Sequence, residues 1–310
     1  MKTIRLSAFL LTLLISLFSC QQDEDIILNR VPIAEAGHSV NITLPVKSIS
    51  LSGTGTDTDG QIVAYLWSQV SGPASTNITN PGAASTDING FVEGNYVFQL
   101  MVTDDDGATG VDTVAVSVNP AVEKTVTIQP SNNPDEKMLV TIGGKDQSFQ
   151  GSKEWVVDAW TVNGQSYTGR VAFKFDLSSV PATATIVQAS LYLYSNNPPI
   201  NGNLQDPNYG SANGLVLQQI TSQWSPATAD WFHQPQTTET NEVLIPATSQ
   251  SVLDLNINVT DLVSAMIKTD SNYGFLMKLQ NEVEYNSRMF VSSYHPEKTS
   301  KHPKLVVIYK

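Results

Sequence analysis

The residues best suited to bind a ligand lie in one stretch of the chain, SKEWVVDAWTVNGQSYTGR. Its aromatic side chains offer flat apolar faces to the C–H groups of a sugar ring, and its basic side chains can pair with hydroxyl or carboxylate groups. The candidate glycan-binding residues are Lys153, Trp155, Trp160, Tyr167 and Arg170. Because arginine can form paired hydrogen bonds with a uronate carboxylate, this mixture favours an anionic glycan. In the alternative interpretation, Trp160 and Tyr167 are strand residues that face the core.

A second basic segment, HPEKTSKHPK, spans residues 295–304. We expect a hairpin there, in which Lys298 and Lys301 are further candidates for contact with a uronate carboxylate. Most basic runs of this kind are solvated loops with no ligand, so that alternative stays open.

The sequence shows no signature of catalysis. It contains neither the HExxH motif of zinc proteases nor the GxSxG motif of serine hydrolases. None of the four histidines has a partner at the spacing of metal ligands. We therefore expect no catalytic residues, no enzymatic activity and no cofactor. Paired carboxylates for glycoside cleavage have no fixed motif, so an enzyme such as a polysaccharide lyase remains one alternative.

Acidic turns early in the chain are compatible with a structural Ca²⁺. Asp57, Asp59 and the run from Asp104 to Asp106 place oxygen ligands in loops, as calcium sites do. Asp and Gly also dominate ordinary turns for conformational reasons, and no complete calcium-loop spacing is present. The metal ligands therefore stay unassigned.

Composition excludes one class of partner. The chain has 310 residues, of which 41% are hydrophobic and only 15% charged, and its formal net charge is −12. Residues 21–120 hold 12 acidic and two basic side chains. A nucleic-acid surface needs concentrated Lys and Arg, so we expect no nucleic-acid partner. The length suits two hydrophobic cores.

Short runs of alternating apolar residues predict β-strands in both halves of the chain. The alternation is clearest over residues 96–102 and 114–118, and again over 171–177 and 191–193. One helix is expected, capped by Thr260 or Asp261, with a buried stripe of Leu262, Val263, Met266 and Ile267. The prediction is an all-β protein of two sandwiches with one short helix.

The N-terminus has the pattern of an export signal. Lys2 and Arg5 precede an apolar run that is too short to span a bilayer as a mature helix. The tetrapeptide LFSC resembles the lipobox of bacterial lipoproteins. That resemblance implies that residues 1–19 are a signal peptide and that Cys20 carries the lipid. An ordinary cleaved signal with an incidental cysteine is the alternative.

The acid-rich segment QQDED follows Cys20 directly. It is similar to the export signal that sends lipoproteins of Bacteroidetes-type bacteria to the outer face of the outer membrane. The resemblance implies an acidic tether over residues 20–30 and a lipid-anchored protein that faces the cell exterior. A solvated tether without a receptor is the alternative.

Residues 31–120 resemble a PKD domain, an immunoglobulin-like module of extracellular proteins. The resemblance rests on the motif series D-x-D-G, Y-x-W, G-x-Y and V-T-D-x-x-G. It implies a small β-sandwich in which Trp67 is the core tryptophan of a central strand. Domains of this family usually act as spacers or make protein contacts.

Residues 121–310 resemble the DNRLRE family. The blocks that carry the resemblance are GRVAFKFDLSSVPATATIVQASLYLY, ITSQWSPATADWFHQP, LNINVTDLVSAMI with SNYGFLMKL, and SRMFVSSYHPE with HPKLVVIY. The family implies a jelly-roll-like β-sandwich that binds carbohydrate, including acidic polysaccharides such as alginate. The N-terminal strand departs from the family pattern, and the long loop from Asn196 to Asn213 looks like an insertion. The binding surface is therefore expected to differ from that of its relatives.

Together these observations predict a non-catalytic surface lipoprotein. It would bind a polysaccharide, with an acidic glycan favoured, and would pass it to neighbouring enzymes and an importer. The main alternative is a surface adhesin or structural protein whose two domains make protein contacts. An exposed aromatic platform at Trp155 or Trp160 would count against the adhesin.

Overall fold

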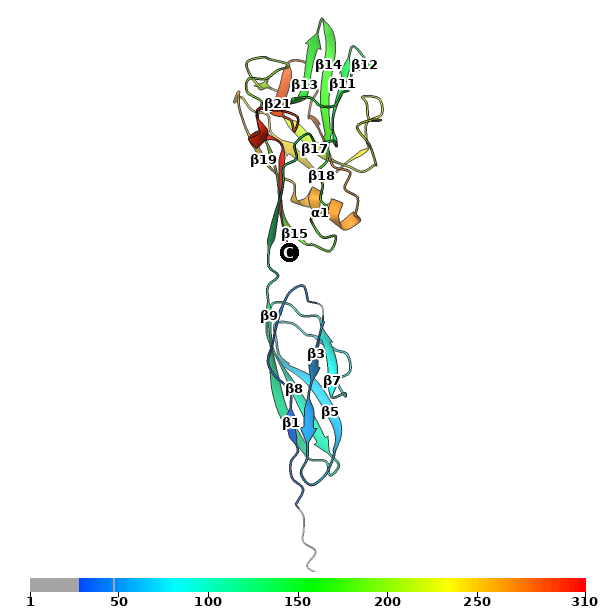
Figure 1. Cartoon of the computed structure of the whole chain (residues 1–310), viewed down its shortest axis with the longest axis vertical. Coiled ribbons are helices and arrows are strands. Elements are labelled where there is room, and N and C mark those ends of the chain that lie inside the picture. Colours follow the sequence, from blue (N-terminus) through cyan, green and yellow to red (C-terminus); the bar gives the residue numbers. More distant parts are fainter. Residues whose placement is uncertain (1–27, 47) are drawn as a thin grey trace, which may run out of the picture. The chain divides into compact units, whose positions relative to one another are not determined.

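The computed structural model describes residues 28–46 and 48–310, which form two compact units divided between Pro120 and Ala121 (Figure 1). Strands supply nearly all of the regular structure, and the expected all-β fold class is confirmed. Within the described residues, no helix has the length and apolar character needed to cross a membrane. The predicted signal peptide and Cys20 lie outside the described residues.

The first unit is a sandwich of a four-stranded sheet, in the order β2-β9-β8-β5, and a three-stranded sheet, in the order β3-β7-β6. A small pair of strands, β1 and β4, completes it. The strands are β1 (Ile33–Glu35), β2 (Val40–Thr43), β3 (Ser48–Ser52), β4 (Thr54–Thr56), β5 (Ile62–Ser71), β6 (Asn77–Ile78), β7 (Ser85–Asn89), β8 (Gly94–Asp104) and β9 (Thr109–Asn119).

The core of the first unit follows the two-residue period of its strands. The predicted face of β8 is fully buried, as alternation requires when one side of a strand meets the opposite sheet. Trp67 is 1% exposed, which confirms its core role, but β5 lies at the edge of its sheet and not at the predicted centre. The Tyr96 hydroxyl donates to the carbonyl of Val92 and accepts from its amide, which fixes the turn before β8.

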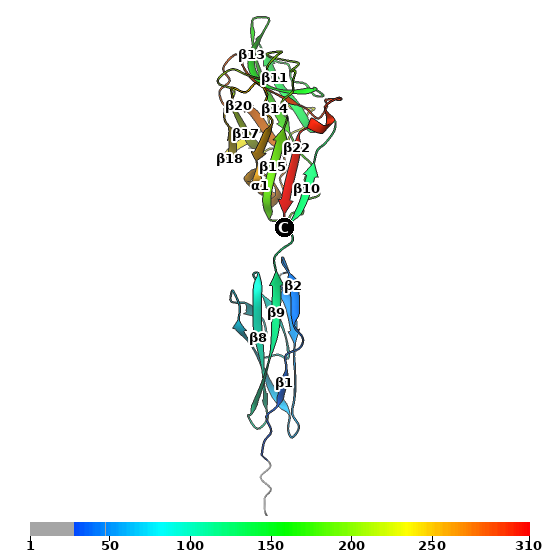
Figure 2. The same cartoon turned by 90° about the vertical axis from the view of Figure 1, so that its left-hand side faces the viewer.

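The second unit contains a four-stranded sheet in the order β10-β22-β15-β19, of which β10, β22 and β15 lie side by side in Figure 2. The larger sheet follows the order β16-β21-β13-β14-β20-β17-β18, and β11 pairs with β14 and β12. The elements are β10 (Lys124–Ile128), β11 (Glu136–Ile142), β12 (Lys145–Asp146), β13 (Glu154–Val162), β14 (Gln165–Phe173), β15 (Ile186–Leu193), β16 (Asn208–Tyr209), β17 (Leu215–Ile220), β18 (Thr237–Ile245), β19 (Leu255–Asn258), α1 (Thr260–Thr269), β20 (Phe275–Leu279), β21 (Asn286–Val291), the 3-10 turn η1 (Thr299–Lys301) and β22 (Lys304–Tyr309).

Two apolar clusters stabilise the second unit. The main core holds the predicted apolar faces of residues 171–177 and 191–193. A smaller cluster of Leu139, Ala172, Ile220, Ala229 and Leu276 packs against Trp224 and Trp231. Residues of the two clusters alternate along β11, β14 and β20, so these strands are covered on both faces.

Helix α1 buries the predicted stripe of Leu262, Val263, Met266 and Ile267. The predicted cap is wrong, because Val259 occupies the N-cap position and has no polar side chain. Instead, the side-chain oxygen of Asn258 accepts a hydrogen bond from the Thr260 amide at 3.0 Å. This contact orders the entry to the helix.

Candidate glycan-binding site

The β13–β14 hairpin distributes the predicted ligand residues over two faces of the sheet. Successive side chains of a strand point to opposite sides, so Trp155 and Trp160, five positions apart, diverge. Tyr167 and Arg170 diverge for the same reason. The register places Trp160 directly opposite Tyr167. The predicted group of five residues is therefore not one site.

Trp155 belongs to the core, and its prediction as a sugar platform is wrong. Its side chain is 1% exposed, and its ring centroid lies 4.5 Å from that of Phe173. Burial of so large an apolar surface stabilises the fold and removes both ring faces from solvent. A saccharide has no access to this indole.

Arg170 is paired with protein groups, which argues against its prediction as a uronate ligand. Its Nε and Nη2 donate to the two carboxylate oxygens of Glu282 at 2.6 and 2.9 Å, and its Nη1 donates to Gln234 at 3.0 Å. The guanidinium also stacks over the Trp231 ring at 4.6 Å. The Glu282 carboxylate neutralises the positive charge of Arg170, which would otherwise attract the carboxylate of a uronate.

We expect Arg170→Met to lower the free energy of unfolding by about 1 kcal/mol, because a partly exposed ion pair contributes little net stability. Retention on any polysaccharide should equal that of the wild type. Urea denaturation and affinity electrophoresis measure the two effects. Loss of retention at an unchanged unfolding midpoint would restore Arg170 as a ligand residue.

The segment HPEKTSKHPK does not form the predicted hairpin. It connects β21 of the larger sheet to β22 of the other sheet through η1, and these two strands do not pair. His295 and His302 are buried, with His302 Nε2 2.9 Å from the His295 carbonyl oxygen. A chain that changes sheets cannot close a hairpin, which requires neighbouring antiparallel strands.

The three predicted lysines outside the sheet differ in their contacts. The Lys298 ammonium donates to the side-chain oxygen of Asn196 and, at 3.0 Å, to the carbonyl of Asn197. Those contacts hold the half-buried Lys298 against the loop that contains Asn196 and Asn197, so its role as a ligand residue stays a prediction. Lys153 and Lys301 are exposed.

An aromatic cluster of Trp160, Tyr209 and Tyr285 lies at the end of the larger sheet. The Trp160 ring stands nearly edge-on to those of Tyr209 and Tyr285, with centroid distances of 5.5 and 5.2 Å. Tyr209 is 38% exposed and Tyr285 50% exposed, while Trp160 is half-buried. Such packing holds the rings rigid and leaves apolar surface available to a ligand.

Polar groups lie in the cross-strand row next to this cluster. Asp158 pairs with Ser287 on one side and with Gly169 on the other. Asp158 is 2% exposed and Ser287 fully buried, and neither Asp158 Oδ1 nor Ser287 Oγ has a hydrogen-bond partner in the described part of the chain. Gly169 is required here, because a Cβ would lie 2.6 Å from the Val156 carbonyl oxygen and 3.0 Å from that carboxylate oxygen.

Burial disfavours the ionised forms of Asp158 and of Tyr167, which lies two positions before Gly169 on β14. Burial, together with the negative charge of Glu154, raises the pKa of Asp158 well above its usual value. Burial and the charges of Asp158 and Glu154 also raise the pKa of Tyr167, so its hydroxyl stays protonated. The buried polar groups support the sheet from within, and the exposed rings of Tyr209 and Tyr285 are the part of this region that a carbohydrate can reach.

The loop from Asn196 to Asn213 positions one ring of the cluster. The buried Glu154 accepts hydrogen bonds from the Asn196 side chain at 2.7 Å and from the Asn201 amide at 3.0 Å. The loop then forms β16, which pairs with β21 and carries Tyr209. This loop, whose status as an insertion stays a prediction, therefore contributes a residue to the site.

Sequence reasoning missed Tyr209 and Tyr285. Each stands in a polar loop, DPNYGS and EVEYNS, and an isolated tyrosine among polar residues was the only available signal. Trp160 stays a candidate in this cluster. Tyr167 is half-buried and packs against the main core, as the alternative interpretation of this residue expected.

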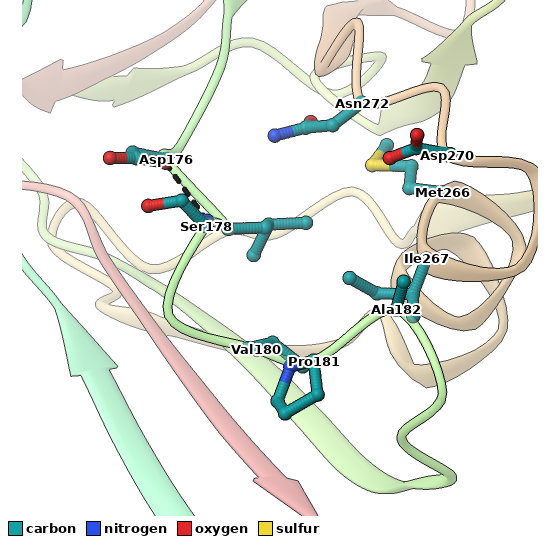
Figure 3. A pocket seen from close by; sticks show the side chains of 10 residues that line it. Asp176, Ser178, Val180, Pro181, Ala182, Met266, Ile267, Asp270 and Asn272 are labelled. Carbon is teal, nitrogen blue, oxygen red and sulfur yellow. Dashed lines mark hydrogen bonds between the residues drawn. The ribbon is translucent and has the colours of Figure 1, made fainter.

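A cleft in another part of the second unit is a second candidate for a ligand site. A cleft of about 400 Å³ separates Asp176 and Ser178 from the α1 residues Met266 and Ile267 (Figure 3). None of its lining side chains is aromatic, although stacking on a sugar ring requires such a face. We therefore place the candidate site at the aromatic cluster and not in this cleft.

The described ranges, 28–46 and 48–310, contain no group of three or more His, Cys, Asp or Glu residues arranged to hold a metal ion. In the acidic turn of the first unit, Asp104 accepts hydrogen bonds from the amides of Asp106 and Ala108 at 3.1 and 2.8 Å. Such contacts are typical of a turn. The structural Ca²⁺ stays a prediction.

Two family models match the chain, one in each unit. Residues 36–118 match the K319L-like PKD domain, which confirms the PKD resemblance. Residues 134–309, more than half of the chain, match carbohydrate-binding module family 96. The chain belongs to carbohydrate-binding module family 96. Both families are non-catalytic kinds of domain, and the DNRLRE assignment stays a resemblance.

Several curated relatives of this family 96 protein are animal proteins. The mouse dyslexia-associated protein KIAA0319-like protein is 30% identical over 125 residues, 40% of this chain and 12% of the relative. Human KIAA0319 is 29% identical over 143 residues, covering 44% of this chain and 13% of the relative. Human low-density lipoprotein receptor-related protein 11 is 34% identical over 94 residues, 30% and 19% of the two chains. The chain thus spans less than a fifth of these relatives.

Solved structures resemble the family 96 protein only loosely. The PKD domain of the KIAA 1837 protein is 33% identical, with a TM-score of 0.27, and covers 28% of this chain and 86% of that one. A carbohydrate-binding module of the β-sandwich superfamily is 14% identical, with a TM-score of 0.23. The match covers 91% of this chain and 92% of that one. The assignment therefore rests on the family models.

Proposed function

We propose that this family 96 protein binds a polysaccharide at the aromatic cluster of Trp160, Tyr209 and Tyr285. The observation that carries the proposal is the edge-to-face packing of three rings from separate strands and turns, two of them substantially exposed. Rings held in this way lose little conformational entropy when a sugar ring stacks its C–H groups against them.

An acidic glycan is the finer form of this proposal. Burial, with the charges of Lys298 and Lys153, lowers the pKa of His295, which supports a basic surface near the start of β13. Lys301 is exposed in the same β21–β22 connection. Lys153 precedes β13 and Trp160 lies near its other end, so a uronate-containing chain that contacts both must extend along this strand.

The cellular setting is likewise a proposal. The lipobox-like LFSC and the acidic QQDED support a lipid anchor on Cys20 and export to the outer face of an outer membrane. The PKD-like unit would act as a spacer. The bound glycan would then pass to neighbouring enzymes and an importer of a glycan-utilisation system.

The decisive experiment is affinity electrophoresis of the full mature chain against neutral polysaccharides and alginate. We expect Trp160→Ala and Tyr285→Ala each to weaken retention roughly tenfold, the equivalent of about 1.4 kcal/mol for a lost aromatic contact. Phe232→Ala is the matched control, since Phe232 is 63% exposed and lies outside the cluster.

Two results would overturn the proposed site. If Trp160→Ala bound like the wild type, the glycan would lie on another surface. If no polysaccharide retained the wild type, the adhesin alternative would be favoured.

The double variant Lys153→Gln with Lys301→Gln tests the proposal that the glycan is acidic. It should weaken binding of alginate and leave binding of neutral polysaccharides unaffected.

A further inference from the structure

Arg288 on β21 is a buried cation without a countercharge. Its side chain is fully buried, and none of its three nitrogens has a hydrogen-bond partner among the residues that the structure describes. The ion pairs among the residues that the structure describes do not include Arg288. They join Arg170 with Glu282, Lys174 with Asp135, and His233 with Asp230. Burial lowers the pKa of Arg288 only to about 10, so the guanidinium stays charged at neutral pH.

The protein groups next to Arg288 satisfy it only in part. The Phe290 ring lies 5.7 Å from the guanidinium carbon, a weakly favourable cation–π contact. Asn208 is its cross-strand neighbour, and the side-chain oxygen of Asn208 is also buried without a partner. The Asn208 amide group donates to Gln250 at 3.2 Å, which orients that oxygen. Even if that oxygen moved into hydrogen-bond range, a single neutral acceptor could serve only one of the five N–H donors and would supply no negative charge.

The nearest acidic side chains on the adjoining strand do not face the guanidinium. Arg288 pairs with Val157 of β13, and alternation turns Glu154 and Asp158 to the opposite side of that strand. Residues 247–253, which hydrogen-bond to β16, contain no charged residue. The next residue, Asp254, accepts a hydrogen bond from the Ser195 amide. The charge of Arg288 is therefore uncompensated by the described residues around it.

We propose that Arg288 holds a small monovalent anion, of the size of chloride or formate, inside the second unit. A desolvated charge with no partner is among the most unfavourable groups in a fold, and arginine cannot lose its proton near neutral pH. An anion supplies both the missing charge and an acceptor for several N–H donors. A uronate within a polymer is too large for a fully buried position, so the ligand is a free ion.

The test uses thermal and urea unfolding of the full chain in sodium chloride and in sodium gluconate at equal ionic strength. Chloride should raise the wild-type midpoint, with the folding equilibrium constant rising about tenfold per tenfold increase in chloride above its dissociation constant. Arg288→Met should lose this dependence. Arg170→Met, which removes an arginine already paired with Glu282, is the matched control and should keep it.

Either of two results would overturn the anion site. Equal wild-type midpoints in chloride and gluconate would show that Arg288 is unpaired, and so would a chloride dependence that persists in Arg288→Met. If that variant does not fold, wild-type crystals grown in bromide decide the question. An anomalous peak beside the Arg288 guanidinium supports the site, and its absence there rejects it.

Discussion

Replacing Trp155 by alanine should lower the free energy of unfolding of the second unit by about 3–5 kcal/mol, the range for a buried tryptophan truncated in a core. The indole is 1% exposed and packs against Phe173, itself part of the main core. The strands around it cannot close the space that its removal leaves. Urea denaturation followed by tryptophan fluorescence and circular dichroism measures the loss.

Trp160→Ala is the matched control, because Trp160 lies on the same strand but is half-buried in the aromatic cluster. It should destabilise the unit less and weaken glycan retention more. A Trp155→Ala protein with wild-type stability and lost retention would contradict the structure. It would return Trp155 to the role of a binding platform.

The second large effect concerns pH and Glu136. Burial raises the pKa of Glu136 from 4.5 to about 7, and the nearby Ser293 and Trp155 side chains offset this shift only in part. Between these two pH values the folded state holds a proton that the unfolded state releases. The free energy of unfolding therefore falls as pH rises through this window, by about 3 kcal/mol in total.

Glu136→Gln should remove this slope, since glutamine keeps the shape of the protonated acid and does not ionise. The variant should be more stable than the wild type at pH 8 and similar to it at pH 4.5. Urea unfolding at a series of pH values measures the effect. Glu239→Gln, at an exposed position of β18, is the control and should follow the wild type. An unchanged slope in Glu136→Gln would refute the assignment.

Asp158 contributes to the same trend. Burial also raises the pKa of Asp158. Any pH dependence of the unfolding free energy that remains in Glu136→Gln should therefore still be a fall in stability with rising pH. Glu136 is nevertheless the residue to vary first, because Asp158 adjoins the candidate glycan site and a change there would affect binding as well.

Local pattern was sufficient for the strands, the helix and most of the core. The faces of residues 96–102 and 171–177 follow from the two-residue period, and the stripe of α1 follows from the helical period. These periods depend on backbone geometry alone, so neighbouring residues carry the information. The export signal is likewise a property of sequence, and it stays a prediction.

Only the tertiary structure decided whether the side chains on each face of a strand are buried, paired with other residues or exposed. Trp155 stands in a sheet that is covered on both sides over much of its extent, so alternation alone could not separate a core indole from a surface one. Arg170 finds Glu282 112 positions away, and no local pattern reveals that pairing. Both corrections have one cause, because burial and ion pairing depend on layers and loops distant in sequence.

The aromatic cluster shows the same division between sequence and structure. The stretch around Trp160 is visible in the sequence as a mixture suited to sugars, but only the register of β13, β21 and β16 brings Tyr209 and Tyr285 to its ring. Composition and periodicity determined that this chain is an all-β protein with sugar-compatible side chains. Strand order and the loop from Asn196 to Asn213 decided which of those side chains share a surface, since register is a property of paired strands.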